Sequence, residues 1–201
     1  MSITLYEFSP TRSDRVRWTL LELGEPFESI EGRELIGSER LKRAHPLSKL
    51  PAIEDDGRPL FESAAICTWL ADKHSDKRLI AKAGSWERAL HDQWVCFALT
   101  EVEAHLWSTA RNMFVYPEKA RIPAIVEQNN AELRRALPVL NAHLADHDFM
   151  VGDRFSVTDI IVGFAVNWAQ NAGVTNGLAN LEAYNERLRA RPHCPLKKMK
   201  M

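Results

Sequence analysis

Sequence patterns typical of strands are confined to the first third of this 201-residue chain, and this asymmetry restricts the folds that the chain can adopt. Short runs of β-branched and aromatic residues alternate there with apolar residues at helical spacing. From Ser85 onward the strand signals disappear, and long stretches rich in Ala, Leu, Glu and Arg take over. The sequence therefore predicts a domain of strands and helices followed by an all-helical domain.

The first domain is predicted to follow the order βαβαββα. Predicted strands lie at 3–8, 26–30, 51–55 and 58–61, and predicted helices at 16–23, 41–45 and 62–73. Gly24 stands where a helix end needs a residue with positive φ, and Pro46 stops the short second helix. Asp56-Gly57 separates the last two strands, because this pair supplies the positive φ values of a tight hairpin turn.

In the second domain, one helix start is specified by its capping residues. Ser156 and Asp159 have the spacing of a capping box, so both are predicted to be structural residues. The helix that they open, 157–169, is apolar on nearly every side and should be buried in the core. Gly163 within it is expected to mark a close backbone approach. An earlier helix is predicted over 86–113.

The domain boundary is predicted from a short polar segment between the two patterns. We place the first domain at 1–79, a linker at 80–85 and the helical domain at 86–201. A basic tail at 197–200 is expected to be solvated.

Charge and hydropathy exclude several classes of partner. The formal net charge of -1 leaves no global field that would attract nucleic acid or an anionic membrane. No charged-then-apolar leader opens the sequence, and no apolar run approaches the roughly 18 residues of a membrane span. We therefore expect a cytoplasmic protein that binds neither nucleic acid nor membrane and takes a small molecule as its partner.

Cysteine and histidine spacing gives no metal or disulfide signal. Cys67, Cys96 and Cys194 are far apart and odd in number, and they form no Cys-x-x-Cys pair. Cys67 and Cys96 lie in apolar helical patterns and are expected to be buried. His143 and His147 share a helix face, but a third ligand is not evident, so no metal site is predicted.

Two short motifs carry a resemblance to a known family. Lys49-Leu50-Pro51-Ala52-Ile53 and Phe61-Glu62-Ser63-Ala64-Ala65-Ile66 flank the predicted hairpin, and the capping box follows in the helical half. Together these features resemble the glutathione transferases, of bacterial type, across essentially the whole chain. The resemblance implies a thioredoxin-like first domain, a helical-bundle second domain, glutathione as co-substrate, a homodimer and a role in detoxification.

The resemblance and the residue chemistry agree on a glutathione site. A cis bond before Pro51 would leave the Leu50 amide and carbonyl able to pair with the backbone of a bound tripeptide, whereas a trans proline would simply open a strand. Ser63 at a helix N-terminus can hold a carboxylate while Glu62 holds an ammonium, the two charges of a γ-glutamyl group. Plain capping by Ser63 is the structural alternative. Lys49 and Arg12 are cations that could meet the glycyl carboxylate.

The turn after the first strand is where the family places the group that ionises the thiol. An unperturbed thiol pKa of about 8.5 leaves only a few per cent thiolate at neutral pH, so a donor aimed at sulfur is needed. The turn offers Ser9, Thr11 and Ser13, which we rank in that order, with capping of the helix as the alternative for Ser13. Tyr6 lies inside the strand and is expected to pack. No Cys is present in the turn, so a Ser/Thr-type transferase is favoured over a Cys-type one.

The resemblance also places the second substrate. In the family the 86–113 helix and its continuation line the acceptor pocket, which selects Trp107, Arg111 and Phe114 as pocket residues. The implied activity is conjugation of the glutathione thiolate to small apolar electrophiles, with peroxide reduction as a possible extension. Two alternatives are a glutathione-dependent isomerase of the maleylacetoacetate-isomerase type and a non-enzymatic interaction protein on the same fold.

Overall fold

A computed structural model describes residues 2–197, so most of the basic tail at 197–200 lies outside the described residues. The chain divides into two compact units. One contains the chain up to Ala83 together with His193–Pro195, and the other contains Gly84–Pro192. The division falls within the predicted linker, but the sequence placed 193–195 in the helical domain, and in the structure this short segment groups with the first unit.

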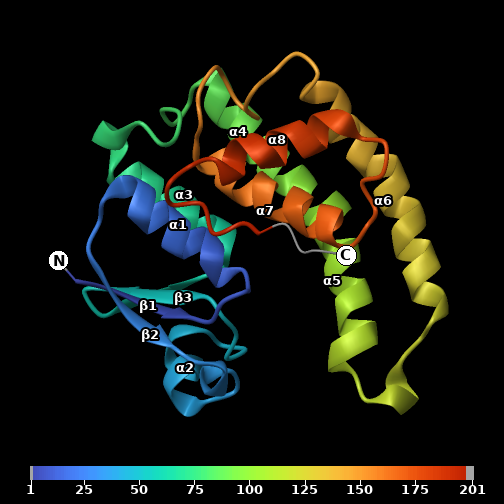
Figure 1. Ribbon diagram of the computed structural model, residues 1–201. Coiled ribbons are helices and arrows are strands. Elements are labelled where there is room, and N and C mark those ends of the chain that lie inside the picture. Colours follow the sequence, from blue (N-terminus) through green and yellow to red (C-terminus); the bar gives the residue numbers. More distant parts are fainter. Residues whose placement is uncertain (1, 198–201) are drawn as a thin grey trace. The chain divides into compact units, whose positions relative to one another are not determined.

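The first unit has the predicted βαβαββα order (Figure 1). Its strands are β1 (Ile3–Glu7), β2 (Phe27–Glu31), β3 (Ala52–Asp55) and β4 (Arg58–Phe61), and its helices are α1 (Ser13–Leu23), α2 (Glu39–Ala44) and α3 (Ser63–Lys73). The sheet order is β2-β1-β3-β4, with β1 parallel to β2 and antiparallel to β3. This is the predicted thioredoxin-like arrangement, and only the element ends differ from the sequence prediction.

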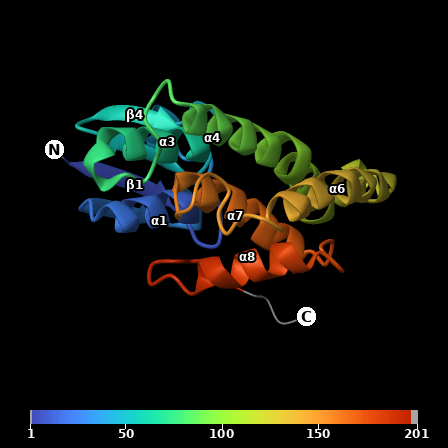
Figure 2. The ribbon, with the colours of Figure 1, turned by 90° about the horizontal axis from the view of Figure 1, so that it is seen from above.

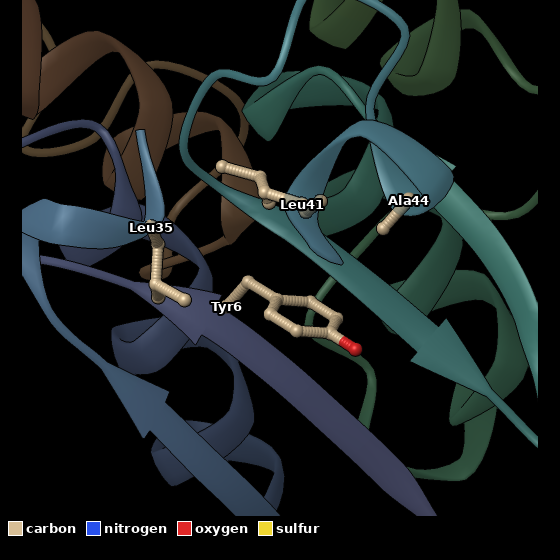
Figure 3. Packing of buried hydrophobic residues seen from close by; sticks show 5 residues of the cluster. Tyr6, Leu35, Leu41 and Ala44 are labelled. Carbon is tan, nitrogen blue, oxygen red and sulfur yellow. The ribbon is translucent and has the colours of Figure 1, made fainter. Parts of the chain in front are cut away.

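Helices cover both faces of this sheet. In Figure 1, α1 and α3 lie side by side on one face and α2 lies on the other. The α2 face buries the hydrophobic cluster of Figure 3, made of Tyr6, Leu35, Leu41, Ala44 and Ala52. The expected packing of Tyr6 is thus confirmed, and its hydroxyl donates to Glu54 Oε1 at 3.1 Å.

Local turn chemistry explains two of the element ends. Gly24 ends α1 with a φ of 68° in the left-handed region, as the sequence predicts. At the hairpin, Asp56 and Gly57 have φ values of 49° and 76°, the pair of positive values that a tight two-residue turn needs. Because register follows from this turn, Ala52 pairs with Phe61 across the β3–β4 ladder.

The second unit is helical throughout its described part. Its main helices are α4 (Trp86–Phe97), α5 (Ala104–Ala110), α6 (Ala124–His143), α7 (Val157–Asn171) and α8 (Ala179–Arg189). Figure 2 shows α7 between α4 and α8, and eleven of its residues are buried, which confirms its predicted core position. Short 3₁₀ helices occur at Arg33–Leu35 and Ser75–Lys77 in the first unit and at Glu118–Ala120 in the second.

The predicted 86–113 helix is present but is not a uniform α-helix. Two π-helical segments, Ala98–Glu103 and Arg111–Val115, follow α4 and α5 respectively. Neither segment contains Pro or Gly, so the local sequence carried no signal for this change of hydrogen bonding. Such segments are rare and often lie at functional sites.

Two expectations about small residues had different outcomes. A Cβ on Gly163 would lie 2.2 Å from Leu188 Cδ1, so a close approach exists, but a side chain of α8 makes it rather than backbone. Cys67 is buried as predicted, whereas the prediction for Cys96 was wrong, because this residue lies on the exposed side of α4. Among the described residues, no helix is both long and apolar enough to cross a membrane.

Candidate functional site

Ser13 lies fully buried at the first position of α1. Its hydroxyl oxygen accepts a hydrogen bond from the Phe8 N–H at 3.3 Å and lies 2.9 Å from the Thr11 hydroxyl. The Ser13 N–H donates to Thr11 Oγ1 at 3.2 Å. These bonds close the turn between β1 and α1. Arg12, not Ser13, occupies the N-cap position, so capping by Ser13 was the wrong alternative.

Ser9 and Thr11 are more accessible than Ser13. Ser9 is exposed, and among the described residues its hydroxyl makes only a long contact of 3.4 Å to Asp14 Oδ2. Thr11 is half-buried and its hydroxyl also contacts the Phe8 carbonyl oxygen. Because a hydroxyl has one proton, Thr11 must give up an internal bond before it can donate to a ligand. Ser9 would lose only its long, weak hydrogen bond to Asp14 on donating to a ligand.

The Leu50–Pro51 peptide bond is cis, the form that the family resemblance implied, and Ser9–Pro10 is a second cis bond that was not predicted. Leu50 is half-buried and its side chain packs against the cluster of Figure 3. Within residues 2–197, the backbone N–H and C=O of Leu50 have no hydrogen-bond partner. Backbone groups presented in this way can pair with an extended peptide.

The start of α3 combines an unusual backbone with a helix N-terminus. Glu62 has a φ of 70° and a ψ of 108°, outside the regions that non-glycine residues normally occupy. Residues held in such conformations cluster at functional sites. Glu62 is exposed, while Ser63 is buried as the first residue of α3. The Ser63 N–H therefore stands at the positive end of the α3 dipole, where a carboxylate is stabilised.

Arg15 is a site residue that the sequence analysis missed. The side chain is 1 % exposed, and its Nη1 donates to Ser63 Oγ at 3.3 Å. A buried arginine next to a helix N-terminus adds positive charge to the region where Ser63 would hold a carboxylate. The available signal was its position: Arg15 precedes Trp18 by three residues and Leu23 by eight, so it lies on the buried stripe of α1.

His45 is the second missed residue. It is 4 % exposed, its Nδ1 accepts a hydrogen bond from the Leu47 N–H at 3.1 Å, and its ring centroid lies 4.8 Å from that of Phe61. Burial lowers the pKa of His45, the charge of Glu62 raises it and the charge of Lys49 lowers it. The neutral ring therefore holds the turn that leads to Lys49 and Leu50. It also packs against Phe61, the residue before Glu62.

The two cations that were expected near the glycyl carboxylate lie at different parts of the first unit. Lys49 is exposed directly before Leu50, while Arg12 is half-buried at the start of α1. Arg15 connects α1 to Ser63 through its hydrogen bond, whereas Arg12 shares its turn with the three hydroxyls.

In the second unit, the predicted pocket residues form an aromatic and cationic group. Arg111 Cζ lies 5.9 Å from the ring centroid of Trp107, and the Trp107 ring lies 6.5 Å from that of Trp168. Phe114 is 75 % exposed, three residues further along the π-helical segment. Trp107 and Arg111 are brought together, while Phe114 extends into solvent.

His143 is the last residue of α6 and His147 lies beyond the helix end, so the two do not share a helix face as expected, and both have backbone partners. His143 Nε2 lies 3.0 Å from the Met150 carbonyl oxygen, and His147 Nδ1 lies 2.8 Å from that of His143. The two rings stack with centroids 4.4 Å apart. One nitrogen of each ring is thus engaged by backbone, and within residues 2–197 no three His, Cys, Asp or Glu side chains gather in a metal-binding group.

Comparison with known proteins places these features in a family. Residues 9–73 match the model of the glutathione S-transferase N-terminal domain, and residues 102–192 match that of the C-terminal domain. Glutathione S-transferase F13 of Arabidopsis thaliana is 32% identical over 160 residues, which cover 74% of this chain and 71% of that protein. The chain therefore belongs to the glutathione S-transferase family.

Two further relatives show how widely this fold is used. The theta class glutathione S-transferase of Xanthomonas axonopodis pv. citri, solved with glutathione bound, has a TM-score of 0.80 and 25% identity, with 95% of this chain and 94% of that chain covered. Elongation factor 1-gamma of Prunus avium is 34% identical over 120 residues, 60% of this chain, but the match spans only 28% of that protein.

Proposed function

We propose that this protein is a glutathione transferase that conjugates the glutathione thiolate to small apolar electrophiles. The observation that carries the proposal is the unpaired Leu50 backbone beside the cis bond to Pro51, in the same unit as the Glu62–Ser63 helix start. The Leu50 N–H and C=O would pair with the cysteinyl backbone of glutathione. Glu62 would hold the γ-glutamyl ammonium, and Ser63, supported by Arg15, the γ-glutamyl carboxylate.

At the other end of the tripeptide, Lys49 and Arg12 are the proposed partners of the glycyl carboxylate. Lys49 adjoins Leu50 and is exposed, so its side chain is free to reorient toward the carboxylate of a bound ligand. Arg12 lies in the turn that carries the hydroxyls, and its guanidinium can form a bidentate pair with a carboxylate. The attraction between either cation and the carboxylate would be stronger in the complex than between two charges at the open surface, because the bound ligand excludes water from the pair.

In the proposed reaction, a hydroxyl stabilises the glutathione sulfur as a thiolate. The thiol proton leaves to solvent, the sulfur lone pair forms a bond to the electrophilic carbon, and the leaving group departs with its bonding electrons. Ser9 is the preferred donor because its only internal contact is the long one to Asp14. Thr11 is the second choice and Ser13, which is buried and bonded, the third. The N-terminus of α1 adds positive potential.

Several finer points belong to the same proposal. A Ser/Thr-type transferase is favoured over a Cys-type one because the turn from Ser9 to Asp14 contains no thiol. We further propose a homodimer in the cytoplasm, supported by the family resemblance and by three cysteines that form no disulfide within the described residues. Peroxide reduction and maleylacetoacetate-type isomerisation use the same bound thiolate, so they are secondary activities to be measured.

A second candidate function is a non-catalytic interaction module. The similarity to elongation factor 1-gamma favours it, because in such a protein the matched region is only part of a larger chain. A docking module has no need of an ionised thiol or of the charges at Glu62 and Ser63. The positive φ of Glu62 therefore favours the catalytic proposal.

The test separates binding from turnover. Glutathione affinity is measured by calorimetry, and turnover is measured with chlorodinitrobenzene, cumene hydroperoxide and maleylacetone. Glu62→Gln, which keeps the side-chain size, should weaken binding at least tenfold, while Glu28→Gln on the exposed face of β2 serves as the matched control. Binding without turnover would support the interaction module, and absence of both would overturn the proposal.

A further inference from the structure

Arg111 lies in an environment that leaves its charge unmatched. Its Cζ lies 5.9 Å from the ring centroid of Trp107 and 5.6 Å from that of Tyr116. The side chain is half-buried, and its Nε is sealed from solvent without a hydrogen-bond partner. Within residues 2–197, no carboxylate lies within 4.0 Å of this guanidinium.

A half-buried cation in this state has unused binding capacity. Burial removes water from the guanidinium, and most buried charges regain that loss through an acidic partner. Here the two aromatic rings supply part of the compensation through their negative faces. The terminal nitrogens still carry N–H donors in the planar fork that matches a carboxylate. An anionic ligand would complete the compensation.

Hydrogen bonds in the segment from Ser108 to Ile122 hold Arg111 and the two rings in position. The Tyr116 N–H donates to the Arg111 carbonyl at 2.8 Å, which closes the π-helical segment. Buried Asn112 donates to the Ser108 carbonyl at 3.0 Å and accepts from the Ile122 N–H at 3.0 Å, so it fastens the loop to the helix. The aromatic rings and the guanidinium are therefore held in place before a ligand arrives.

The same loop adds a second positive charge. Arg121 Nε donates to the Tyr116 carbonyl at 2.9 Å, so its guanidinium lies on the loop that carries Tyr116. The acidic residue of this loop, Glu118, is exposed and forms no ion pair with Arg111. Arg111 and Arg121 therefore place two positive charges close to Tyr116.

We infer that Arg111, together with Trp107 and Tyr116, forms a site selective for aromatic acceptors that carry an anionic substituent, such as a carboxylate on an electron-poor ring. The ring of the ligand would pack against Trp107 or Tyr116, and its carboxylate would receive the Arg111 N–H donors. This inference rests on the proposed transferase function for its biological meaning, because the ligand would be the electrophile that glutathione attacks. The selectivity itself is a property of the second unit.

Equilibrium binding tests the selectivity without glutathione. The probes are 3,5-dinitrobenzoate and its neutral counterpart 1,3-dinitrobenzene, titrated against the full chain by calorimetry. The wild-type protein should bind the carboxylate at least tenfold more tightly, and Arg111→Gln should reduce this ratio to within twofold, because the carboxylate probe loses more affinity than the neutral one. Arg111→Lys, which keeps the charge but not the fork, should give an intermediate ratio.

Arg134→Gln on α6 is the matched control, because this exposed arginine pairs with Glu127 and should leave the ratio unchanged. Equal affinity of the wild-type protein for both probes would overturn the inference, as would an undiminished ratio in a folded Arg111→Gln variant. Turnover of 4-chloro-3,5-dinitrobenzoate against chlorodinitrobenzene then tests the reaction. Selective binding without turnover of either compound would uphold the anion site and overturn the transferase proposal.

Discussion

Arg15 and Ser63 join two helices of the first unit through a buried contact: Arg15 Nη1 donates to Ser63 Oγ at 3.3 Å. Arg15 lies in the first turn of α1 and Ser63 is the first residue of α3, so the contact fixes the N-terminus of α3 relative to α1. An arginine in this position contributes both packing volume and charge. Its removal should therefore affect stability and ligand binding in separable ways.

The first prediction concerns that contact. Ser63→Ala should lower the free energy of unfolding by about 1–3 kcal/mol, because the buried guanidinium loses an acceptor. It should also weaken glutathione binding by at least about tenfold. Urea unfolding and calorimetry measure the two effects. Ser75→Ala, at an exposed serine of the same unit, is the control, and equal losses of affinity in both variants would contradict the role of Ser63.

The second prediction assigns the thiol-activating hydroxyl. Ser9→Ala should raise the pKa of bound glutathione by about one unit or more and cut the conjugation rate at neutral pH by about tenfold or more, with little effect on stability. Ser13→Ala should instead cost about 1–2 kcal/mol of stability, because the Phe8 N–H loses its acceptor. Ultraviolet titration of the bound thiolate provides the measurement. A normal thiolate in Ser9→Ala with a lost one in Thr11→Ala would transfer the role to Thr11.

Residues whose role depends on local chemistry were predicted well from the sequence. The hairpin at Asp56-Gly57 and the capping box at Ser156 each follow from a few adjacent residues, whereas the cis bond before Pro51 was implied by the family resemblance. The buried α7 was predictable for a related reason, since an all-apolar helix can only be stable in a core.

Residues whose role depends on long-range packing were not predicted. Arg15 meets Ser63 across 48 positions of sequence, and a single arginine on an apolar stripe does not reveal its partner. The prediction that Cys96 is buried was wrong, because an apolar pattern does not show which side of a helix a neighbouring element covers. The π-helical segments around Arg111 have no local sequence cause, so the loop geometry that fixes Tyr116 could be found only in the structure.

The third prediction concerns pH and His45. Burial lowers the pKa of His45 in the folded protein, so the unfolded chain binds a proton more readily as the pH falls below about 6.5. The folded state should therefore lose stability on acidification through this residue, and the loss of the Nδ1 acceptor for Leu47 should weaken glutathione binding at the same time.

His45→Asn tests this coupling, because an Asn oxygen can replace the acceptor for the Leu47 N–H without titrating. The variant should bind glutathione within about threefold of wild type at pH 7.5 and lose less affinity than wild type between pH 7 and 5. His45→Ala should bind weakly at every pH. Identical pH profiles for His45→Asn and wild type would show that the imidazole has no part in the acid response.

The fourth prediction distinguishes the cysteines by reactivity. Burial raises the pKa of the Cys67 thiol to about 12, so this residue should not react with a disulfide reagent while the protein is folded. Exposed Cys96 should react quickly, and Cys96→Ser should remove that phase. Mass spectrometry of the labelled peptides identifies the site. Labelling of Cys67 at a rate independent of denaturant would contradict its burial.

The fifth prediction uses Asp159, the acidic member of the capping box. Its Oδ1 accepts from the Met150 N–H at 2.8 Å and the Tyr184 hydroxyl at 2.9 Å, and its Oδ2 accepts from the Ser156 N–H at 2.8 Å. Complete burial nevertheless raises the pKa of Asp159 to about 6, since desolvation outweighs the bonds that lower it. An unfolded Asp has a pKa of about 3.9.

The sign of the resulting pH dependence follows from these two pKa values. Between pH 4 and 6 the folded protein retains a proton that the unfolded chain has lost, so the contribution of Asp159 favours folding at the acidic end of this interval and declines as the pH rises. The total change is up to about 3 kcal/mol for a two-unit difference in pKa. This slope is opposite to that expected for His45, so the two residues must be separated by substitution.

Asp159→Asn provides the separation. At pH 7 the variant should be less stable by about 2–4 kcal/mol, because the amide nitrogen that replaces Oδ2 cannot accept from the Ser156 N–H. The difference in unfolding free energy between wild type and variant should grow as the pH falls from 6 to 4, since only the wild-type protein gains the bound proton. Urea unfolding at several pH values gives this difference curve. A constant difference would show that the Asp159 carboxyl ionises at an ordinary pH despite its burial. A difference that shrinks on acidification would show that its pKa is lowered in the folded protein, and that hydrogen bonding rather than desolvation dominates at the start of α7.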